Sequence, residues 1–267
     1  MNTLLILGLF ICCLGIFLHF KYLLFAPKAD GLRILMYHKI SYGISDGLTV
    51  PLEDFEKQIH YLKKKGFKFI GLSELIEYSS NNPKSLKNCV ILTFDDAYDE
   101  TFRILEPVLR HHKIKAAVMI PTAHIGKVNK WDDRMDAIID KETIRCTNPS
   151  IFEFGLHSAE HINYRRCDIF QISKDIEDSI KCMDENKFSY YKILAYPYGG
   201  FPRDKITYEN FKRILAEHQI LFGMRIGNRI NKIPFKDSYL LKRIDIKGTD
   251  SFELFKRKIK TGREKYF

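Results

Sequence analysis

The sequence predicts an α/β fold with a parallel sheet that is rolled into a barrel or partial barrel. Short apolar runs alternate with amphipathic segments from residue 32 onwards, and this repeated β-α order is typical of parallel sheets. Four of the runs are followed by residues that can do chemistry: His38, the pair Asp95 and Asp96, His157 and Tyr198. Because parallel strands end on the same side of a barrel, we expect these residues to meet at one mouth.

The first half of this domain is expected to contain four strands, at residues 32–37, 67–70, 89–94 and 115–120. The run at 89–94 is almost entirely apolar, as expected of a strand that is covered on both faces. Helices are predicted between the strands because apolar residues recur there at helical spacing. They comprise a helix with Leu52, Phe55, Ile59 and Leu62 and the C-cap Gly66, a short helix over 74–78 with the N-cap Ser73, and a helix with Phe102, Leu105 and Leu109.

The second half continues the alternation. Strands are expected at residues 152–156, 193–196, 221–226 and 240–244. Helical spacing predicts a long helix over 169–183, another around 211–215 and a last one over 252–259. The polar segment 122–150 is predicted to be a long loop, and it carries Trp131, the only tryptophan of the chain.

The N-terminal residues 4–20 are nearly all apolar and predict a membrane helix at the short end of the usual range. The alternative is a cleaved signal peptide. However, no Lys or Arg precedes the run, and no small-residue cleavage site follows it. We therefore expect a single-pass anchor or signal-anchor at residues 1–24, a linker at 25–31 and one α/β domain at 32–267.

Charge and cysteine content narrow the class of protein. The formal net charge is +10, with scattered lysines and arginines that suit anionic membranes or polymers. No motif that reads RNA or DNA is present, so we expect no nucleic-acid partner. The six cysteines have no CxxC spacing, which argues against a zinc knuckle or a disulfide framework.

The acidic pair and the two histidines predict a metal site. Adjacent carboxylates repel each other, so a cation or a proton transfer must occupy them. His157 and His161 are four residues apart, and on a helical turn both imidazoles would face one ion. One Asp with two His forms an open three-ligand site that suits zinc best, with nickel, cobalt or iron as alternatives. The other Asp can then act as a general base. The alternatives are a helix N-cap for the acids and a structural role for the histidines.

Four short motifs resemble one enzyme family. Thr93-Phe94-Asp95-Asp96, His157-Ser158-x-x-His161, Tyr196-Pro197-Tyr198-Gly199 and the opening Leu35-Met36-Tyr37-His38 are similar to the motifs of polysaccharide deacetylases of the NodB-homology type, carbohydrate esterase family 4. The branch they resemble most includes the poly-N-acetylglucosamine deacetylases. The resemblance covers residues 32–259. It implies a distorted (β/α) barrel of seven strands and a metal-dependent hydrolase that removes N-acetyl groups from the amino sugars of a glycan.

The resemblance also implies roles for single residues. They are Asp95 as general base, Asp96, His157 and His161 as metal ligands, the Tyr198 backbone amide as oxyanion donor, and His38 as acid. Many relatives orient the base with an Arg three residues before the tyrosine, where this chain has Ala195. We expect Arg243, on the strand at 240–244, to supply that charge instead. The usual C-terminal Leu-x-x-His is missing, which leaves His38 as the sole acid.

Side chains with flat rings near the predicted site are candidates to contact the substrate. Trp131, Tyr196 and Pro197 are the candidates for contact with pyranose rings. One competing interpretation is a membrane-anchored glycan-binding protein with a weakly active or inactive site, for which Ala195 is the supporting feature. Another metallohydrolase is disfavoured because the His-Glu-x-x-His motif is absent.

The location of the domain is predicted less directly. The charges that follow the apolar run would keep the domain cytoplasmic by the positive-inside rule. Chemistry on a polymer instead favours the cell-envelope side of a membrane-associated protein, which is the location that we expect. The acetylated glycan, the metal and the oligomeric state are left open by the sequence.

Overall fold

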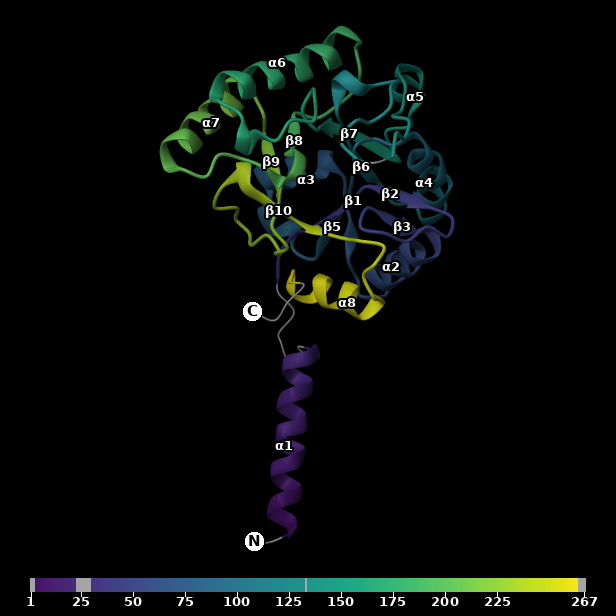
Figure 1. Ribbon diagram of the computed structural model, residues 1–267, viewed down its shortest axis with the longest axis vertical. Coiled ribbons are helices and arrows are strands. Elements are labelled where there is room, and N and C mark those ends of the chain that lie inside the picture. The colour runs from purple at the N-terminus through teal and green to yellow at the C-terminus, as the bar shows by residue number, and fades with distance from the viewer. Residues whose placement is uncertain (1–2, 23–29, 133, 264–267) are drawn as a thin grey trace.

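Seven parallel strands close into a barrel in the computed structural model, which describes residues 3–22, 30–132 and 134–263 (Figure 1). The strand order is β1-β10-β9-β8-β7-β6-β5-β4, and β1 also pairs with β5 to close the ring. The predicted seven-stranded barrel is thus confirmed. Its strands are β1 (Arg33–Tyr37), β5 (Cys89–Asp95), β6 (Ala116–Ile120), β7 (Phe152–Leu156), β8 (Ile193–Ala195), β9 (Phe222–Ile226) and β10 (Leu241–Asp245), while β4 (Lys68–Phe69) extends the sheet beside β5.

The register of the strands decides which residues share the mouth of the barrel. Tyr37 pairs with Phe94 across β1 and β5, so the next residues on each strand, His38 and Asp95, leave the sheet at the same level. All seven residues of β5 are buried, as its apolar sequence predicts. The strands therefore bring their carboxyl-terminal residues to one end, as in other parallel barrels.

Helices surround the barrel (Figure 1). Their apolar faces pack on the strands, and residues such as Phe55, Ile59 and Leu62 are fully buried. Asp168 caps the long sixth helix by accepting a hydrogen bond from the Gln171 amide. The helices are α2 (Leu52–Lys64), α3 (Leu72–Asn81), α4 (Asp99–His112), α5 (Lys141–Cys146), α6 (Ile169–Glu185), α7 (Lys205–Glu217) and α8 (Phe252–Thr261).

The structure corrects two local predictions and adds a sheet that was not predicted. The N-cap of α3 is Gly71 rather than Ser73, whose hydroxyl donates a hydrogen bond to the buried Glu153 carboxylate. The segment 122–150 is more ordered than a loop, since it contains α5, the short 3-10 helix η2 (Thr122–His124) and a bridge between Val128 and Ala137. A small parallel sheet of β2 (Lys39–Ser41) and β3 (Thr49–Pro51), which the sequence analysis did not predict, follows β1 directly.

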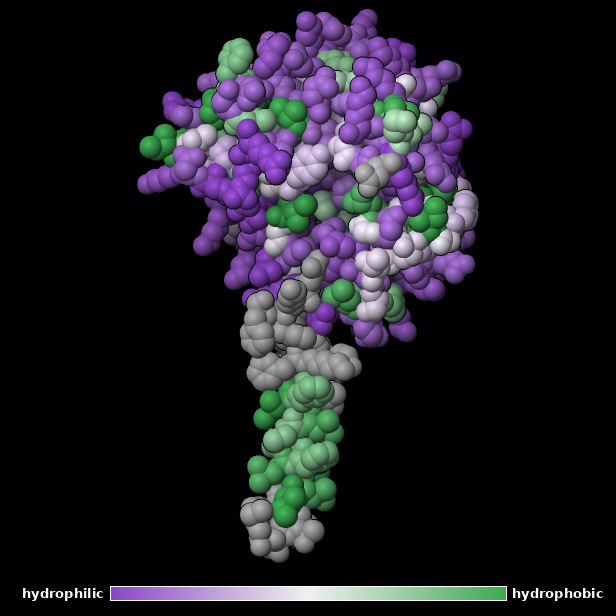
Figure 2. All heavy atoms as spheres, in the orientation of Figure 1, coloured by the Kyte–Doolittle hydropathy of each residue, from purple (hydrophilic) through white to green (hydrophobic). Residues whose placement is uncertain are grey.

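The apolar N-terminal run forms the helix α1 (Thr3–Tyr22). Its side chains, among them Leu9, Phe10 and Ile11, are exposed, and they form an apolar surface that contrasts with the polar surface of the barrel (Figure 2). Across the described parts of the chain, none of the helices combines the length and the apolarity that a membrane crossing requires. The predicted transmembrane span is therefore not confirmed. Most of the predicted linker lies outside the described residues.

Candidate active site

The two adjacent carboxylates, Asp95 and Asp96, have different partners. The backbone after β5 turns sharply, with left-handed conformations at Asp96 (φ 69°) and Ala97 (φ 55°). Such conformations are unfavourable for residues other than glycine and are found most often at functional sites. Both carboxylates are 2% exposed. As a result, Asp95 faces Arg243 and Asp96 faces the two histidines.

Asp96, His157 and His161 converge on one point, as predicted. Asp96 Oδ1 lies 3.5 Å from His157 Nε2 and 3.2 Å from His161 Nε2. One ligand atom from each of the three residues lies within 4.8 Å of the others. His157 Nδ1 is 2.9 Å from the Ala195 carbonyl oxygen, which leaves its Nε2 free to face the site. Asp96 Oδ1 is buried without a well-aligned hydrogen bond, so this donor set fits a divalent ion such as zinc.

The loop that carries the two histidines is not the helical turn that their spacing suggested. The segment between β7 and the short 3-10 helix η3 (Tyr164–Arg166) is irregular, with left-handed conformations at Ser158 and His161. Asp175 on α6 fixes this loop by hydrogen bonds. Its buried carboxylate accepts hydrogen bonds from Ser158 Oγ (2.9 Å), the Ala159 amide (3.1 Å) and the Tyr164 hydroxyl (2.7 Å).

Asp175 was not among the predicted site residues. The sequence does carry a signal for it, because Asp175 interrupts the apolar face that Ile172 and Ile176 form on the predicted helix. A carboxylate in such a position is buried only when donors surround it. Here the donors belong to the loop that carries the histidines, so Asp175 identifies α6 as the helix that supports this loop.

Arg243 occupies a position beside Asp95, where it can replace the arginine that many relatives have in place of Ala195. It donates two hydrogen bonds to Asp95, from Nη1 to Oδ1 (2.5 Å) and from Nη2 to Oδ2 (2.8 Å). Burial raises the pKa of the Asp95 carboxyl, but Arg243 and His157 outweigh this effect and hold the pKa below its usual value. Asp95 is therefore an ionised carboxylate in a fixed orientation, as a general base requires.

His157 lies next to Asp95, and burial lowers its pKa instead of raising it. Desolvation lowers the pKa of His157 to about 4, although the nearby Asp95 and Asp96 oppose that change. His157 is then neutral at physiological pH. A neutral imidazole is the form that binds a metal.

His38 and Tyr198 both lie near these residues at the barrel mouth. His38 follows β1 and is close enough for its charge to lower the pKa of both Asp95 and Asp96. Tyr198 adopts a left-handed conformation (φ 57°), and its ring, 56% exposed, lies 4.9 Å from that of His161 between centroids. The strained backbone at Tyr198 is consistent with a functional position.

The predicted substrate contacts divide into one residue beside the site and two in the core. The Trp131 ring stacks on the His161 ring, with centroids 4.1 Å apart and planes inclined by 18°. Tyr196, in contrast, is completely buried, and its hydroxyl donates a hydrogen bond to the Tyr239 carbonyl (2.8 Å). Pro197 is also buried. The prediction that Tyr196 contacts substrate is therefore wrong, because its ring packs in the core against Tyr164 and Phe211, whereas substrate contact by Pro197 stays a prediction.

A closed parallel barrel with an ionised aspartate and an open Asp-His-His donor set at its mouth is an arrangement that suits a hydrolytic enzyme. Comparison with known proteins makes this class specific. The model of the polysaccharide deacetylase family matches residues 82–214. A poly-beta-1,6-N-acetyl-D-glucosamine N-deacetylase of Staphylococcus aureus is 28% identical over 239 residues, which cover 86% of this chain and 79% of that protein.

Solved structures share the same fold. The Streptococcus pyogenes deacetylase PplD is similar with a TM-score of 0.70 and 21% identity, over 87% of this chain and 98% of that one. IcaB from Ammonifex degensii is similar with a TM-score of 0.71 and 20% identity, over 87% and 97% of the two chains. Residues 82–214 thus form a polysaccharide deacetylase domain, and the homologues indicate that the protein is a hydrolase.

Proposed function

We propose that the protein is a metal-dependent N-deacetylase of a polysaccharide whose amino sugars are N-acetylated, and that β-1,6-linked poly-N-acetylglucosamine is its first candidate substrate. The observation that carries the proposal is the convergence of Asp96, His157 and His161 within 4.8 Å beside the ionised Asp95. The candidate substrate is supported by the name of the Staphylococcus aureus relative.

The metal is assigned to the three residues whose chemistry fits it, Asp96, His157 and His161. A divalent ion at this position, zinc in our proposal, would lower the pKa of a water molecule to about 7 and polarise the acetyl carbonyl. His157 is oriented for this task by the Ala195 carbonyl, and the histidine loop is held by Asp175.

The remaining residues move protons and stabilise charge. Asp95, held by Arg243, accepts the proton of the water that attacks the acetyl carbon. The Tyr198 backbone amide donates a hydrogen bond to the carbonyl oxygen as negative charge develops on it, and such a donor can contribute about 3 kcal/mol. His38 donates a proton to the sugar nitrogen as the C–N bond breaks. The products are acetate and a glycan with a free amino group.

An inactive glycan-binding protein is the weaker alternative. Its only support was Ala195, which removes the arginine that orients the base in many relatives. Because Arg243 makes two hydrogen bonds to Asp95 from a different strand, the base keeps its partner. The geometry thus favours an active enzyme.

We propose further that the domain acts on the cell-envelope side in association with the membrane. The exposed apolar residues of α1 support this location, and the proposed polymeric substrate agrees with it. Cell fractionation and protease treatment of intact cells and spheroplasts test this location. Recovery of the full-length protein in the cytosolic fraction would contradict it.

Acetate release is the direct test of the function. The purified protein would be incubated with β-1,6-linked N-acetylglucosamine oligomers, peptidoglycan and chitin oligomers, with and without a chelator, and with zinc, cobalt or nickel added back. We expect acetate from the β-1,6-linked oligomers, its loss with chelator and its recovery with metal. Absence of acetate from every glycan in the presence of all three metals would contradict the proposal.

A further inference from the structure

The two histidines of the metal site are held in different ways. The His157 ring is fixed by its Nδ1, which lies 2.9 Å from the Ala195 carbonyl oxygen. In contrast, His161 Nδ1 is buried and has no hydrogen-bond partner among the residues that the structure describes. Metal-binding histidines are usually oriented through such a bond from the second ring nitrogen. The orientation of His161 must therefore come from another contact.

Of the described rings that contact His161, the ring of Trp131 is the nearest. The two rings are nearly parallel, inclined by 18°, with centroids 4.1 Å apart. The ring of His124 packs against Trp131 at 4.9 Å with an edge-on angle of 84°. Parallel stacking restricts the tilt of the imidazole but not its hydrogen bonding. It therefore performs the orienting task that a hydrogen bond performs for His157.

A buried lysine holds the segment that carries Trp131. Lys39 is 7% exposed, and its ammonium group lies 2.9 Å from Asp132 Oδ2 and 2.5 Å from Asp136 Oδ2. The Tyr98 hydroxyl donates a hydrogen bond to the same Asp132 oxygen (3.0 Å), and Lys39 lies over the Tyr98 ring, 4.4 Å from its centroid. Asp132 follows Trp131 directly in the chain, so its position determines where the Trp131 ring lies.

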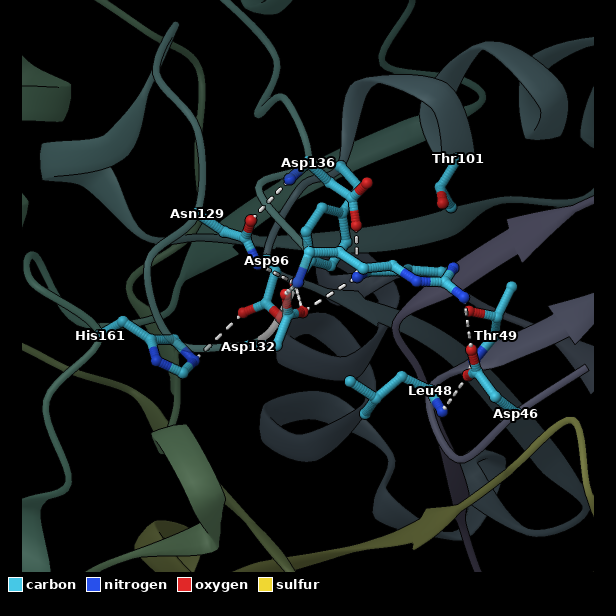
Figure 3. A network of polar contacts seen from close by, with 12 residues as sticks. Asp46, Leu48, Thr49, Asp96, Thr101, Asn129, Asp132, Asp136 and His161 are labelled. Atoms are coloured by element: carbon cyan, nitrogen blue, oxygen red, sulfur yellow. Dashed lines mark hydrogen bonds and ion pairs between the residues drawn. The ribbon is translucent and has the colours of Figure 1, made fainter. Parts of the chain in front are cut away.

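Asn129 completes this cluster from the other side of Trp131. Its side-chain amide donates to the Tyr98 hydroxyl (3.3 Å), and its side-chain oxygen accepts a bond from the Asp136 amide (2.7 Å). We call Lys39, Tyr98, Asn129, Asp132 and Asp136 the Lys39 cluster. In Figure 3 the labelled members Asn129, Asp132 and Asp136 lie beside Asp96 and His161 of the metal site.

We propose that Lys39 is a positioning residue of the metal site: it fixes the Trp131 segment through Asp132, and Trp131 in turn orients the metal ligand His161. The inference rests on the proposed function, since it concerns the same metal. A buried ammonium group that is held by two carboxylates keeps its place only while both partners are present. The cluster thus connects the end of β1 with the loop that carries His161.

The single tryptophan makes this arrangement measurable without an activity assay. Trp131 is the only tryptophan, so the intrinsic tryptophan fluorescence of the protein reports its contact with His161. The probes are zinc, titrated in competition with a chromophoric chelator, and cobalt, a paramagnetic ion that quenches a nearby indole. We expect cobalt to quench the fluorescence of the wild-type protein strongly.

The variants are chosen to separate anchoring from stacking. Lys39→Met and Asp132→Asn weaken the anchor and leave the indole, whereas Trp131→Leu removes the stacked ring and leaves the anchor. We expect each to lower zinc affinity by about tenfold to a hundredfold, the loss typical when a residue that orients a metal ligand is removed. Cobalt quenching should also be weaker in Lys39→Met and Asp132→Asn. Lys57→Met, at an exposed lysine that forms an ion pair with Asp54 on the same helix, is the matched control and should behave as wild type.

The outcomes distinguish this inference from the proposed function. If Lys39→Met does not fold, as judged by circular dichroism, Asp132→Asn and Trp131→Leu decide the question. Wild-type zinc affinity in folded Asp132→Asn and Trp131→Leu would overturn the inference alone. A wild-type protein that binds neither zinc nor cobalt would overturn the proposed metal dependence, and this inference with it.

Discussion

Arg243 and Asp95 are joined by two parallel hydrogen bonds of 2.5 and 2.8 Å, although 148 residues separate them in the sequence. Both side chains are almost completely buried. The contact restores to the base the cationic partner that Ala195 does not provide. An ion pair of this kind gives the carboxylate both its charge state and its orientation.

Removal of Arg243 should move the pH dependence of the reaction. In Arg243→Met the pKa of Asp95 should rise, because burial then acts without the opposing positive charge. Since a general base works in its ionised form, the acidic limb of the pH–kcat/KM profile should move up by about one to three pH units. Acetate release measured from pH 4 to 9 checks this prediction.

Arg243→Lys is the control for the Arg243→Met experiment, because it retains the charge and loses the double hydrogen bond. Its acidic limb should remain near that of the wild type, with a lower kcat. An unchanged acidic limb in a folded Arg243→Met protein would show that the arginine does not set the ionisation of the base.

Substitution of Asp95 and of Asp96 should have different effects on activity and zinc affinity. Asp95→Asn removes the base and should lower kcat at least about a hundredfold, while zinc affinity is retained. Asp96→Asn removes a metal ligand, so zinc affinity and activity should fall together. Zinc titration and acetate release on the same preparations measure both effects. Equal loss of zinc affinity in the two variants would contradict the separate roles.

The metal should also stabilise the fold. An ion that binds only the folded protein raises its stability by about 2.7 kcal/mol at a free concentration of 100 times Kd. Zinc should therefore raise the Tm of chelator-treated protein by several degrees. The zinc-dependent rise in Tm should disappear in His161→Ala. Thermal unfolding followed by circular dichroism measures it, and an equal rise in His161→Ala would place the ion elsewhere.

The predicted site residues that the structure brings together lie where strands end. Asp95, Asp96 and His157 follow buried strands at the same end of the barrel, so their convergence follows from parallel topology alone. Arg243 could be predicted for a similar reason, since it is a charged residue on β10, which pairs with β1, and β1 in turn pairs with β5. Local pattern and topology together were sufficient for these positions.

The residues that were missed depend on contacts between distant segments. Asp175 supports the histidine loop from α6, and Lys39 meets Asp132 across 93 residues. The sequence shows Asp175 as an acid within an apolar helix face, but it does not show which distant residues Asp175 or Lys39 contacts. The error at Tyr196 has a related cause, because the motif does not reveal that the ring turns into the core between Tyr164 and Phe211. The helical turn assumed for His157 and His161 was overridden by the hydrogen bonds to Asp175.

The buried position of Tyr196 predicts a structural phenotype. Tyr196→Phe removes the hydrogen bond to the Tyr239 carbonyl and should lower the free energy of unfolding by about 1 kcal/mol. KM for the glycan should be unchanged, because the ring does not reach the surface. Urea unfolding and steady-state kinetics test both parts. A severalfold rise in KM with unchanged stability would return Tyr196 to the substrate site.

His157 predicts a specific loss of stability in mildly acidic solution for the metal-free protein. Its pKa of about 4 in the folded state lies below the ordinary value of 6.5. Between these two values the unfolded chain binds the proton and the folded protein does not. The free energy of unfolding should therefore fall as pH decreases from about 6.5 to 4, by up to about 1.4 kcal/mol per pH unit for this one group.

The variant His157→Gln isolates this contribution. Burial also lowers the pKa of His112 and His124, so some slope should remain in the variant. Below pH 4 the pH dependence of the free energy of unfolding comes mainly from Asp95 and Asp96. Their pKa values are lower in the folded state, so the unfolded chain takes up protons first and the folded state loses stability. Urea unfolding in the presence of a chelator, at intervals from pH 4 to 7, measures the slopes. If the stability difference between wild type and His157→Gln is the same throughout that range, His157 does not fold as the neutral imidazole that metal binding requires.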